Sequence, residues 1–218
     1  MSLTLHYHPL SAFCQKVLIG LYEAELPFRR NLVDLSDAGQ RAALLELWAM
    51  GKFPVLRDDA RDVTVPESTI ILEYLEQHYA GNGRLVPRDP ERQHASRFAD
   101  RFFDAYVLLP MQKVVGDTFR PDGQHDAIGV AEARAQLATA YAYAEAELCS
   151  QSWAAGADFS LADCAAAPAL FYAQKIRPFD PTLQRLASYY QRLCERPSVA
   201  RVLAEAEPYL ALFPADKL

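Results

Sequence analysis

Apolar positions in the first eighty residues follow two different spacings. Leu3, Leu5 and Tyr7 are apolar at every second position, which indicates a half-buried strand. From residue 12 to 25 the apolar positions recur every three or four residues, which indicates an amphipathic helix. The same contrast then predicts strands at about 28–35, 53–56 and 63–65, and helices at about 38–48 and 67–79. The predicted order, β-α-β-α-β-β-α, suits a small sheet with helices packed on its faces.

The pattern changes after residue 80. Residues 81–90, GNGRLVPRDP, combine two glycines, two prolines and three charges, a composition typical of a linker. Beyond them the spacing is helical throughout and predicts helices at about 91–119, 127–154, 161–175, 182–195 and 199–207. We therefore expect an α/β domain at 1–80 that is joined through this linker to an all-α domain at 91–218.

Composition narrows the class of protein. With 218 residues, 51% of them hydrophobic, the chain can bury a core for two modest domains. Its net charge of -6 argues against binding to nucleic acid or to an anionic membrane, and no apolar run is long enough to span a bilayer. The first residues do not resemble a signal peptide, and the four cysteines are scattered, so we expect a cytoplasmic protein. No metal-binding spacing is evident, and no metal is predicted.

Candidate chemistry begins at Ser11, where the first strand gives way to the first helix. A helix N-terminus presents unpaired N–H groups and a partial positive charge, so it stabilises an anion such as a thiolate. The Ser11 hydroxyl could donate a hydrogen bond to that sulfur, or it could serve only as the helix cap. Cys14 and Tyr7 are rivals for the contact with the sulfur.

Two further segments suggest a site for a small peptide. Lys52, Phe53 and Pro54 precede a short apolar strand, and Lys52 could pair with a carboxylate. Glu67 and Ser68 stand at the predicted start of a helix, where a hydroxyl and backbone N–H groups can hold a carboxylate and an acid can accept from an ammonium group. Such a pair suits an amino-acid head group that carries both charges.

These segments together resemble the cytosolic glutathione transferase superfamily, in particular bacterial members of the serine type related to the theta and zeta classes. The resemblance also rests on the run at 85–92, LVPRDPER, and on Ser160-Leu161-Ala162-Asp163. It implies a thioredoxin-like N-terminal domain that binds glutathione as co-substrate, followed by a helical domain that shapes a pocket for a small apolar electrophile. The family usually reads N-P-x-G-K-V-P-V-L at this place. This chain lacks the first proline and has Phe53 in place of the valine before Pro54, and the bulkier side chain would narrow the pocket.

The resemblance also implies roles for particular residues. Ser11 would activate the glutathione thiolate, and a cis Pro54 would turn the backbone of Phe53 toward the tripeptide. Lys52 would meet the glycyl carboxylate, and Glu67 with Ser68 would bind the γ-glutamyl end. Tyr106 is expected in the second pocket, the protein is expected to act in detoxification, and a homodimer is expected.

Other functions remain open on the sequence. A glutathione-dependent isomerase of the maleylacetoacetate type is one, although its S-S-C-S-W-R run is only partly echoed at residues 11–16. A catalytically silent binding protein with this fold is another. A thiol reductase that acts through Cys14 is a third.

Overall fold

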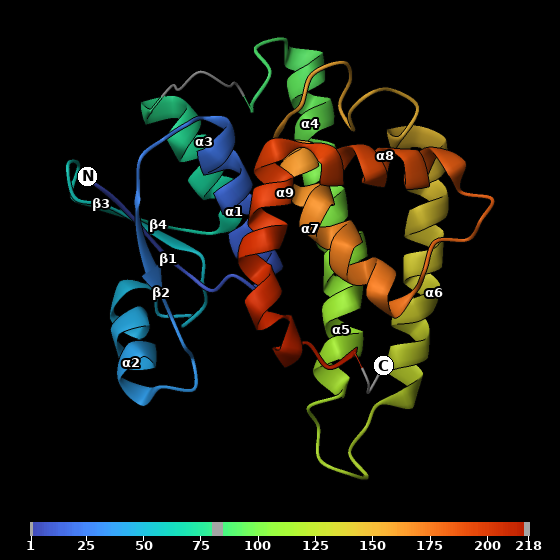
Figure 1. Cartoon of the computed structure of the whole chain (residues 1–218), viewed down its shortest axis with the longest axis horizontal. Coiled ribbons are helices and arrows are strands. Elements are labelled where there is room, and N and C mark those ends of the chain that lie inside the picture. Colours follow the sequence, from blue (N-terminus) through green and yellow to red (C-terminus); the bar gives the residue numbers. More distant parts are fainter. Residues whose placement is uncertain (1, 80–84, 216–218) are drawn as a thin grey trace.

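The computed structural model describes residues 2–79 and 85–215, and it places the sheet on one side and the helical domain on the other (Figure 1). The linker expected at 81–90 therefore lies partly outside the described residues. The domain boundaries given above stay predictions.

One four-stranded sheet forms the N-terminal domain. Its strands lie in the order β2-β1-β3-β4: β1 (Leu3–Tyr7), β2 (Arg29–Leu32), β3 (Val55–Asp58) and β4 (Val63–Pro66). β1 and β2 run parallel, because a helix connects them, whereas β3 is antiparallel to both β1 and β4. The thioredoxin-like order predicted from the alternating pattern is confirmed.

Three helices pack against this sheet: α1 (Ala12–Glu23), α2 (Ala38–Leu47) and α3 (Ser68–His78). Successive strand residues point to opposite faces, so Leu56 joins the main core with α1 and α3 while Val55 joins a small cluster with α2. β2 is shorter than the strand expected at 28–35, and all four of its residues are exposed. It lies at the edge of the sheet, where charged side chains such as Arg29 discourage pairing with another chain.

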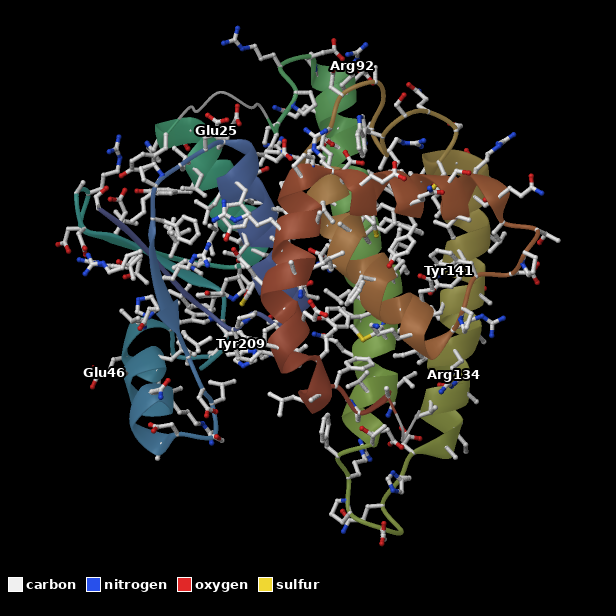
Figure 2. All side chains as sticks on the ribbon, in the orientation of Figure 1. Glu25, Glu46, Arg92, Arg134, Tyr141 and Tyr209 are labelled. Atoms are coloured by element: carbon white, nitrogen blue, oxygen red, sulfur yellow. The ribbon has the colours of Figure 1, made fainter. Side chains whose placement is uncertain are left out.

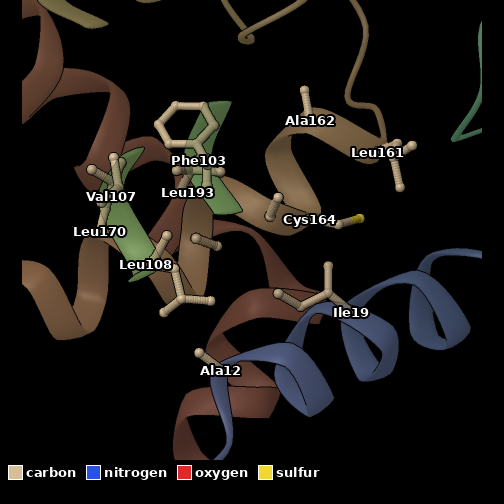
Figure 3. Packing of buried hydrophobic residues seen from close by; sticks show 14 of the residues in the cluster. Ala12, Ile19, Phe103, Val107, Leu108, Leu161, Ala162, Cys164, Leu170 and Leu193 are labelled. Atoms are coloured by element: carbon tan, nitrogen blue, oxygen red, sulfur yellow. The ribbon is translucent and has the colours of Figure 1, made fainter. Parts of the chain in front are cut away.

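The helical domain is built around one buried helix, α7 (Leu161–Ile176), whose residues are nearly all enclosed (Figure 1). Figure 3 shows Ile19 of α1 beside the part of α7 that carries Cys164, while Ala12 lies further along α1. Around α7 lie α4 (Pro90–Phe102), η1 (Phe103–Leu108), α5 (Leu109–Asp117), α6 (Ala127–Tyr143), η2 (Ala144–Leu148), α8 (Gln184–Glu195), α9 (Pro197–Ala206) and η3 (Glu207–Leu212). One hydrophobic cluster includes residues of both domains, so the two share a core.

The start of α7 shows why the helix begins there. The Asp163 carboxylate accepts from the Ser160 N–H at 2.8 Å, from the Ala154 N–H at 2.9 Å and from the Tyr189 hydroxyl at 2.6 Å. Burial raises the pKa of Asp163, and these donors oppose that rise. The capping box expected at Ser160 and Asp163 is present, and it also fixes the preceding loop and α8.

Helix lengths in this domain differ from the prediction at two places. The helix expected at 91–119 contains a π-helical turn, η1, just before Pro110, which has no N–H to give to the preceding turn. The helix expected at 127–154 ends at Leu148, because the next residues form a loop in which Trp153 pairs with Gly156. The 3-10 segment η3 was not predicted.

Candidate functional site

Ser11 lies between β1 and α1, and its side chain caps the helix. Its backbone is extended (φ -78°, ψ 119°), and its hydroxyl oxygen accepts from the Cys14 N–H at 3.4 Å. That contact is long for a hydrogen bond, and the side chain borders a cavity. The hydroxyl proton is therefore available to an acceptor placed at the end of the helix.

Both rivals of Ser11 are enclosed. Cys14 has no exposed surface, and burial raises the pKa of its thiol to about 12, although Ser11 opposes that rise. Burial likewise raises the pKa of Tyr7, with the Arg30 guanidinium opposing the rise. Neither residue lines the cavity beside Ser11. A thiol of this kind is hardly ionised near neutral pH, so Cys14 is poorly suited to act as a nucleophile.

The segment before β3 forms a second wall of the same cavity. The Phe53–Pro54 peptide bond is cis, as expected, and Lys52, Phe53 and Pro54 all border the cavity. Lys52 is exposed and forms no ion pair within the described ranges. Its ammonium group is thus free to meet an anion.

A third wall comes from the start of α3. Glu67 is exposed with φ +70° and ψ 121°, an unusual backbone conformation for a residue with a side chain. Ser68 follows it and is only 4% exposed. A backbone held in such a conformation costs about 1–3 kcal/mol and is most often found at binding sites. Glu67 and Ser68 border the cavity beside Pro54.

The cavity that joins these walls has a volume of about 980 Å³. It brings together the predicted Ser11, Lys52, Phe53, Pro54, Glu67 and Ser68, which come from three separate segments of the chain. Apolar side chains beside them include Phe13, Leu35 and Trp48. A cavity of this size can hold a peptide of a few residues together with a second small molecule.

The helical domain contributes the opposite wall through one face of α4, η1 and α5. The lining residues on this face are Arg97, Asp100, Arg101, Asp104, Leu109 and Gln112. Tyr106 is not among them: it is 50% exposed and packs against Phe102, with ring centroids 5.6 Å apart. The structure therefore does not bring Tyr106 together with Ser11.

A buried ionic network behind this wall escaped sequence reasoning. The Lys16 ammonium lies 2.6 Å from Asp100 Oδ1, 2.7 Å from Asp104 Oδ2 and 2.8 Å from Thr69 Oγ1, and Lys16 is only 1% exposed. The Thr69 hydroxyl donates to Asp100 at 2.9 Å. The signal was a lysine among the apolar positions of the first helix, but its partners lie as far as 88 residues away.

The C-terminal segment reaches the residues that precede Ser11. Tyr209 of η3 lies at the junction between the sheet and the helical domain (Figure 2), and its ring meets the His8 ring edge-on at 5.2 Å. His8 also stacks on Phe53 at 6.1 Å, and its Nδ1 accepts from the Leu10 N–H. Burial lowers the pKa of His8, with Asp34 opposing that change. These contacts fix the loop between β1 and α1.

Across residues 2–79 and 85–215, no group of three or more acidic, histidine or cysteine side chains is arranged to hold a metal ion. No helix in that part of the chain is both long and apolar enough to cross a membrane.

Known proteins share this architecture and resemble the chain in sequence. Residues 5–83 match the family model of the glutathione S-transferase N-terminal domain, and residues 106–197 match that of the C-terminal domain. The chain is 26% identical over 190 residues to glutathione S-transferase GstB of Escherichia coli K12, covering 87% of this chain and 91% of that one. It is 30% identical over 215 residues to FtsZ-localized protein A of Caulobacter vibrioides, covering 95% and 93%.

A solved structure agrees with these sequence matches. The glutathione S-transferase of Methylobacillus flagellatus, crystallised with glutathione bound, superposes with a TM-score of 0.84 at 25% identity and covers 92% of this chain and 98% of that one. A thioredoxin-like domain followed by an all-helical domain, with a cavity between them, defines a two-domain transferase fold. The chain belongs to the glutathione S-transferase family.

Proposed function

We propose that this protein is a glutathione transferase that lowers the thiol pKa of bound glutathione and directs the thiolate at a small electrophile. The observation that carries the proposal is the position of Ser11, whose hydroxyl caps α1 at the edge of the large cavity. An acceptor there meets both the hydroxyl and the positive end of the helix. The reaction forms a carbon–sulfur bond, and the thiol proton passes to solvent.

The rest of glutathione fits the walls already described. The cysteinyl part would lie along Phe53, the glycyl carboxylate would meet Lys52, and the γ-glutamyl head group would bind at Glu67 and Ser68. All of these residues line the same cavity as Ser11. The structure from Methylobacillus flagellatus was crystallised with glutathione bound, which supports glutathione as the ligand.

The first test is a calorimetric titration with glutathione, followed by the ultraviolet absorbance of the bound thiolate against pH. We expect binding, with a thiol pKa below that of free glutathione. Binding without a pKa shift would point instead to a carrier or a reductase. An absence of binding would refute the transferase proposal.

Replacing Ser11 by Ala tests the role of its hydroxyl. A hydrogen bond to a charged group contributes about 1.5–3 kcal/mol, and one pKa unit corresponds to about 1.4 kcal/mol. The pKa of bound glutathione should therefore rise by about one to two units in Ser11→Ala, and conjugation at neutral pH should slow by about 10- to 100-fold.

Two matched variants complete this test. Cys14→Ala removes the rival thiol, and Ser152→Ala removes an exposed hydroxyl outside the cavity. Both should keep the wild-type thiol pKa. A wild-type pH profile in Ser11→Ala would mean that Ser11 only caps the helix.

A non-catalytic binding role is the second candidate, because one relative over nearly the whole chain is FtsZ-localized protein A. Its name describes a location on another protein and not a reaction. Glutathione binding with a lowered thiol pKa would favour the enzyme, whereas the isomerase alternative would require turnover without a net conjugate.

We also propose a homodimer in which the first domain of one subunit packs on the second domain of its partner. Met50, before β3, is 62% exposed, and Phe98, Tyr106 and Tyr143 form an exposed aromatic patch around Phe102. Buried against a partner, this patch would explain the exposure of Tyr106. Equilibrium sedimentation measures the assembly.

Several finer assignments belong to the same proposal. We assign the protein to the serine-type subclass on the role proposed for Ser11, and a part in detoxification is proposed with it from the resemblance alone. All four cysteines are free thiols, which suits the reducing cytoplasm expected from the sequence.

A further inference from the structure

Asp104 places a buried carboxyl group on the wall of the cavity where the sequence led us to expect an apolar surface. The residue is only 9% exposed and comes from the π-helical turn η1. Its Oδ2 atom lies 2.7 Å from the Lys16 ammonium, while Oδ1 is enclosed and has no hydrogen-bond partner within the described residues. A buried acceptor without a donor costs about 1–3 kcal/mol.

One buried cation serves two carboxyl groups in this network. Lys16 is shared between Asp104 and Asp100, so two carboxyl groups face one ammonium group. Burial raises the pKa of Asp104, and both Lys16 and the exposed Arg101 oppose that rise. A ligand cation placed beside Asp104 in the cavity would oppose the rise in the same way as Lys16 and would favour the charged form of the carboxyl group.

Cations on the same wall are weaker competitors. Arg97 is paired with Glu73 at 2.7 Å, and Arg101 is exposed, so water screens its charge. Two unit charges 4 Å apart interact by about 1 kcal/mol in water but by about 4 kcal/mol at the lower effective dielectric found in a protein. A ligand group that comes close to the buried carboxyl group therefore interacts more strongly with it than with the exposed Arg101.

We propose that Asp104, held in place by Lys16, selects a second substrate that carries a cationic hydrogen-bond donor. This inference rests on the proposed transferase function and replaces the purely apolar electrophile expected from the sequence. The reactive carbon would lie near Ser11 and the apolar body against Phe13 and Leu109, with the cation directed at Asp104. Lys16 acts as a positioning residue, because its contact with Thr69 also ties the carboxyl group to the start of α3.

Three benzyl chlorides with one reactive carbon test the selection: para-(chloromethyl)benzamidine, para-methylbenzyl chloride and para-(chloromethyl)benzoate. In each case glutathione sulfur bonds to the benzylic carbon, chloride leaves with the bonding electrons, and the thiol proton passes to solvent. We expect kcat/KM to be at least about 10-fold higher for the amidine than for the methyl compound, because a charge-assisted hydrogen bond contributes about 1.5–3 kcal/mol. The benzoate should be the poorest substrate.

Asp104→Asn keeps the shape of the side chain and removes its charge, so the preference for the amidine should fall to within about 2-fold of the methyl compound. Asp122→Asn, which changes an exposed carboxylate outside the cavity, should retain the full preference. Equal rates for the amidine and the methyl compound in the wild type would overturn the inference. A preference that survives in Asp104→Asn would overturn it as well.

Binding of benzamidine, which has no leaving group, gives a second readout on the unaltered chain. Calorimetry should detect benzamidine but not benzoate in the glutathione complex. If the methyl compound is conjugated without any preference, this inference fails and the transferase function stands. If none of the chlorides reacts, the transferase proposal fails, and benzamidine binding alone then decides the role of Asp104.

Discussion

A buried ammonium group and two buried carboxyl groups are stable only as a set. Lys16, Asp100 and Asp104 are each at most 9% exposed, so water compensates only weakly for a lost partner. The set crosses from α1 to α4 and η1, and Thr69 joins it from α3. These residues therefore carry part of the packing between the two domains as well as one wall of the cavity.

Replacing Lys16 by Met should leave two like charges buried without a counter-ion and lower the free energy of unfolding by about 3–5 kcal/mol. Without Lys16 the carboxyl pKa values in the fold rise above their unfolded values. Stability then falls as pH rises through those values, and the deficit should be greatest near neutral pH and should shrink on acidification. Urea denaturation across a pH series measures it.

Lys113→Met provides the control for this prediction. Lys113 pairs with Asp126, and both side chains are about one-third exposed. A pair of that kind contributes less than about 1 kcal/mol. A deficit in Lys16→Met that does not change with pH would mean that packing of the side chain, and not its charge, is what the fold loses.

The start of helix α7 is fixed by Asp163, whose carboxylate accepts several hydrogen bonds. Asp163→Ala removes the cap and also leaves the Ala154 N–H and the Tyr189 hydroxyl without an acceptor. Loss of a cap costs about 0.5–2 kcal/mol, and each orphaned donor adds about 1–3 kcal/mol. We expect a loss of at least about 2.5 kcal/mol by denaturant unfolding.

Asp89 is the matched comparison, because it caps α4 from an exposed position and accepts only from the Arg92 N–H, at 2.9 Å, among the hydrogen bonds of the described chain. Asp89→Ala should lose only about 1 kcal/mol. Equal losses in the two variants would mean that the loop and α8 do not depend on Asp163.

Most elements were predictable because their spacing is local. The alternation of Leu3, Leu5 and Tyr7 gave β1, and the Ser160 cap gave the start of α7. The π turn η1 was missed because it depends on how the helical hydrogen bonds meet Pro110. The helix end at Leu148 was missed because it depends on the loop that Asp163 holds.

The residues of the candidate site were likewise predicted only in part. The sequence pointed to Ser11, Pro54 and Glu67, and the structure gathers them at one cavity, although their roles stay predictions. Asp104 was not predicted, because its burial and its ion pair with a residue of α1 depend on parts of the chain that are distant in sequence. Tyr106 was assigned to the pocket from its helix alone, and rotation about the helix axis places it elsewhere.

At the scale of the whole molecule, a core shared by both domains should make them unfold together. Arg196 and Glu23 add a salt bridge of 2.6 Å between α1 and the start of α9. The chain has one tryptophan in each domain, Trp48 and Trp153. The single-tryptophan variants Trp48→Phe and Trp153→Phe should therefore give coincident unfolding transitions by fluorescence. Transitions at different urea concentrations would show that the domains are independent.

The π turn at η1 has a consequence for how chain length relates to cavity shape. Asp104 and Leu109 both face the cavity although they lie five positions apart, whereas an α-helix repeats a face after three or four. The turn thus absorbs one extra residue without rotating α5. Relatives one residue shorter here can keep the same lining, so an alignment gap between these two positions does not signal a different pocket. Deletion of two residues would rotate α5 by about 100°, because the π turn absorbs only one of them, and would present other side chains.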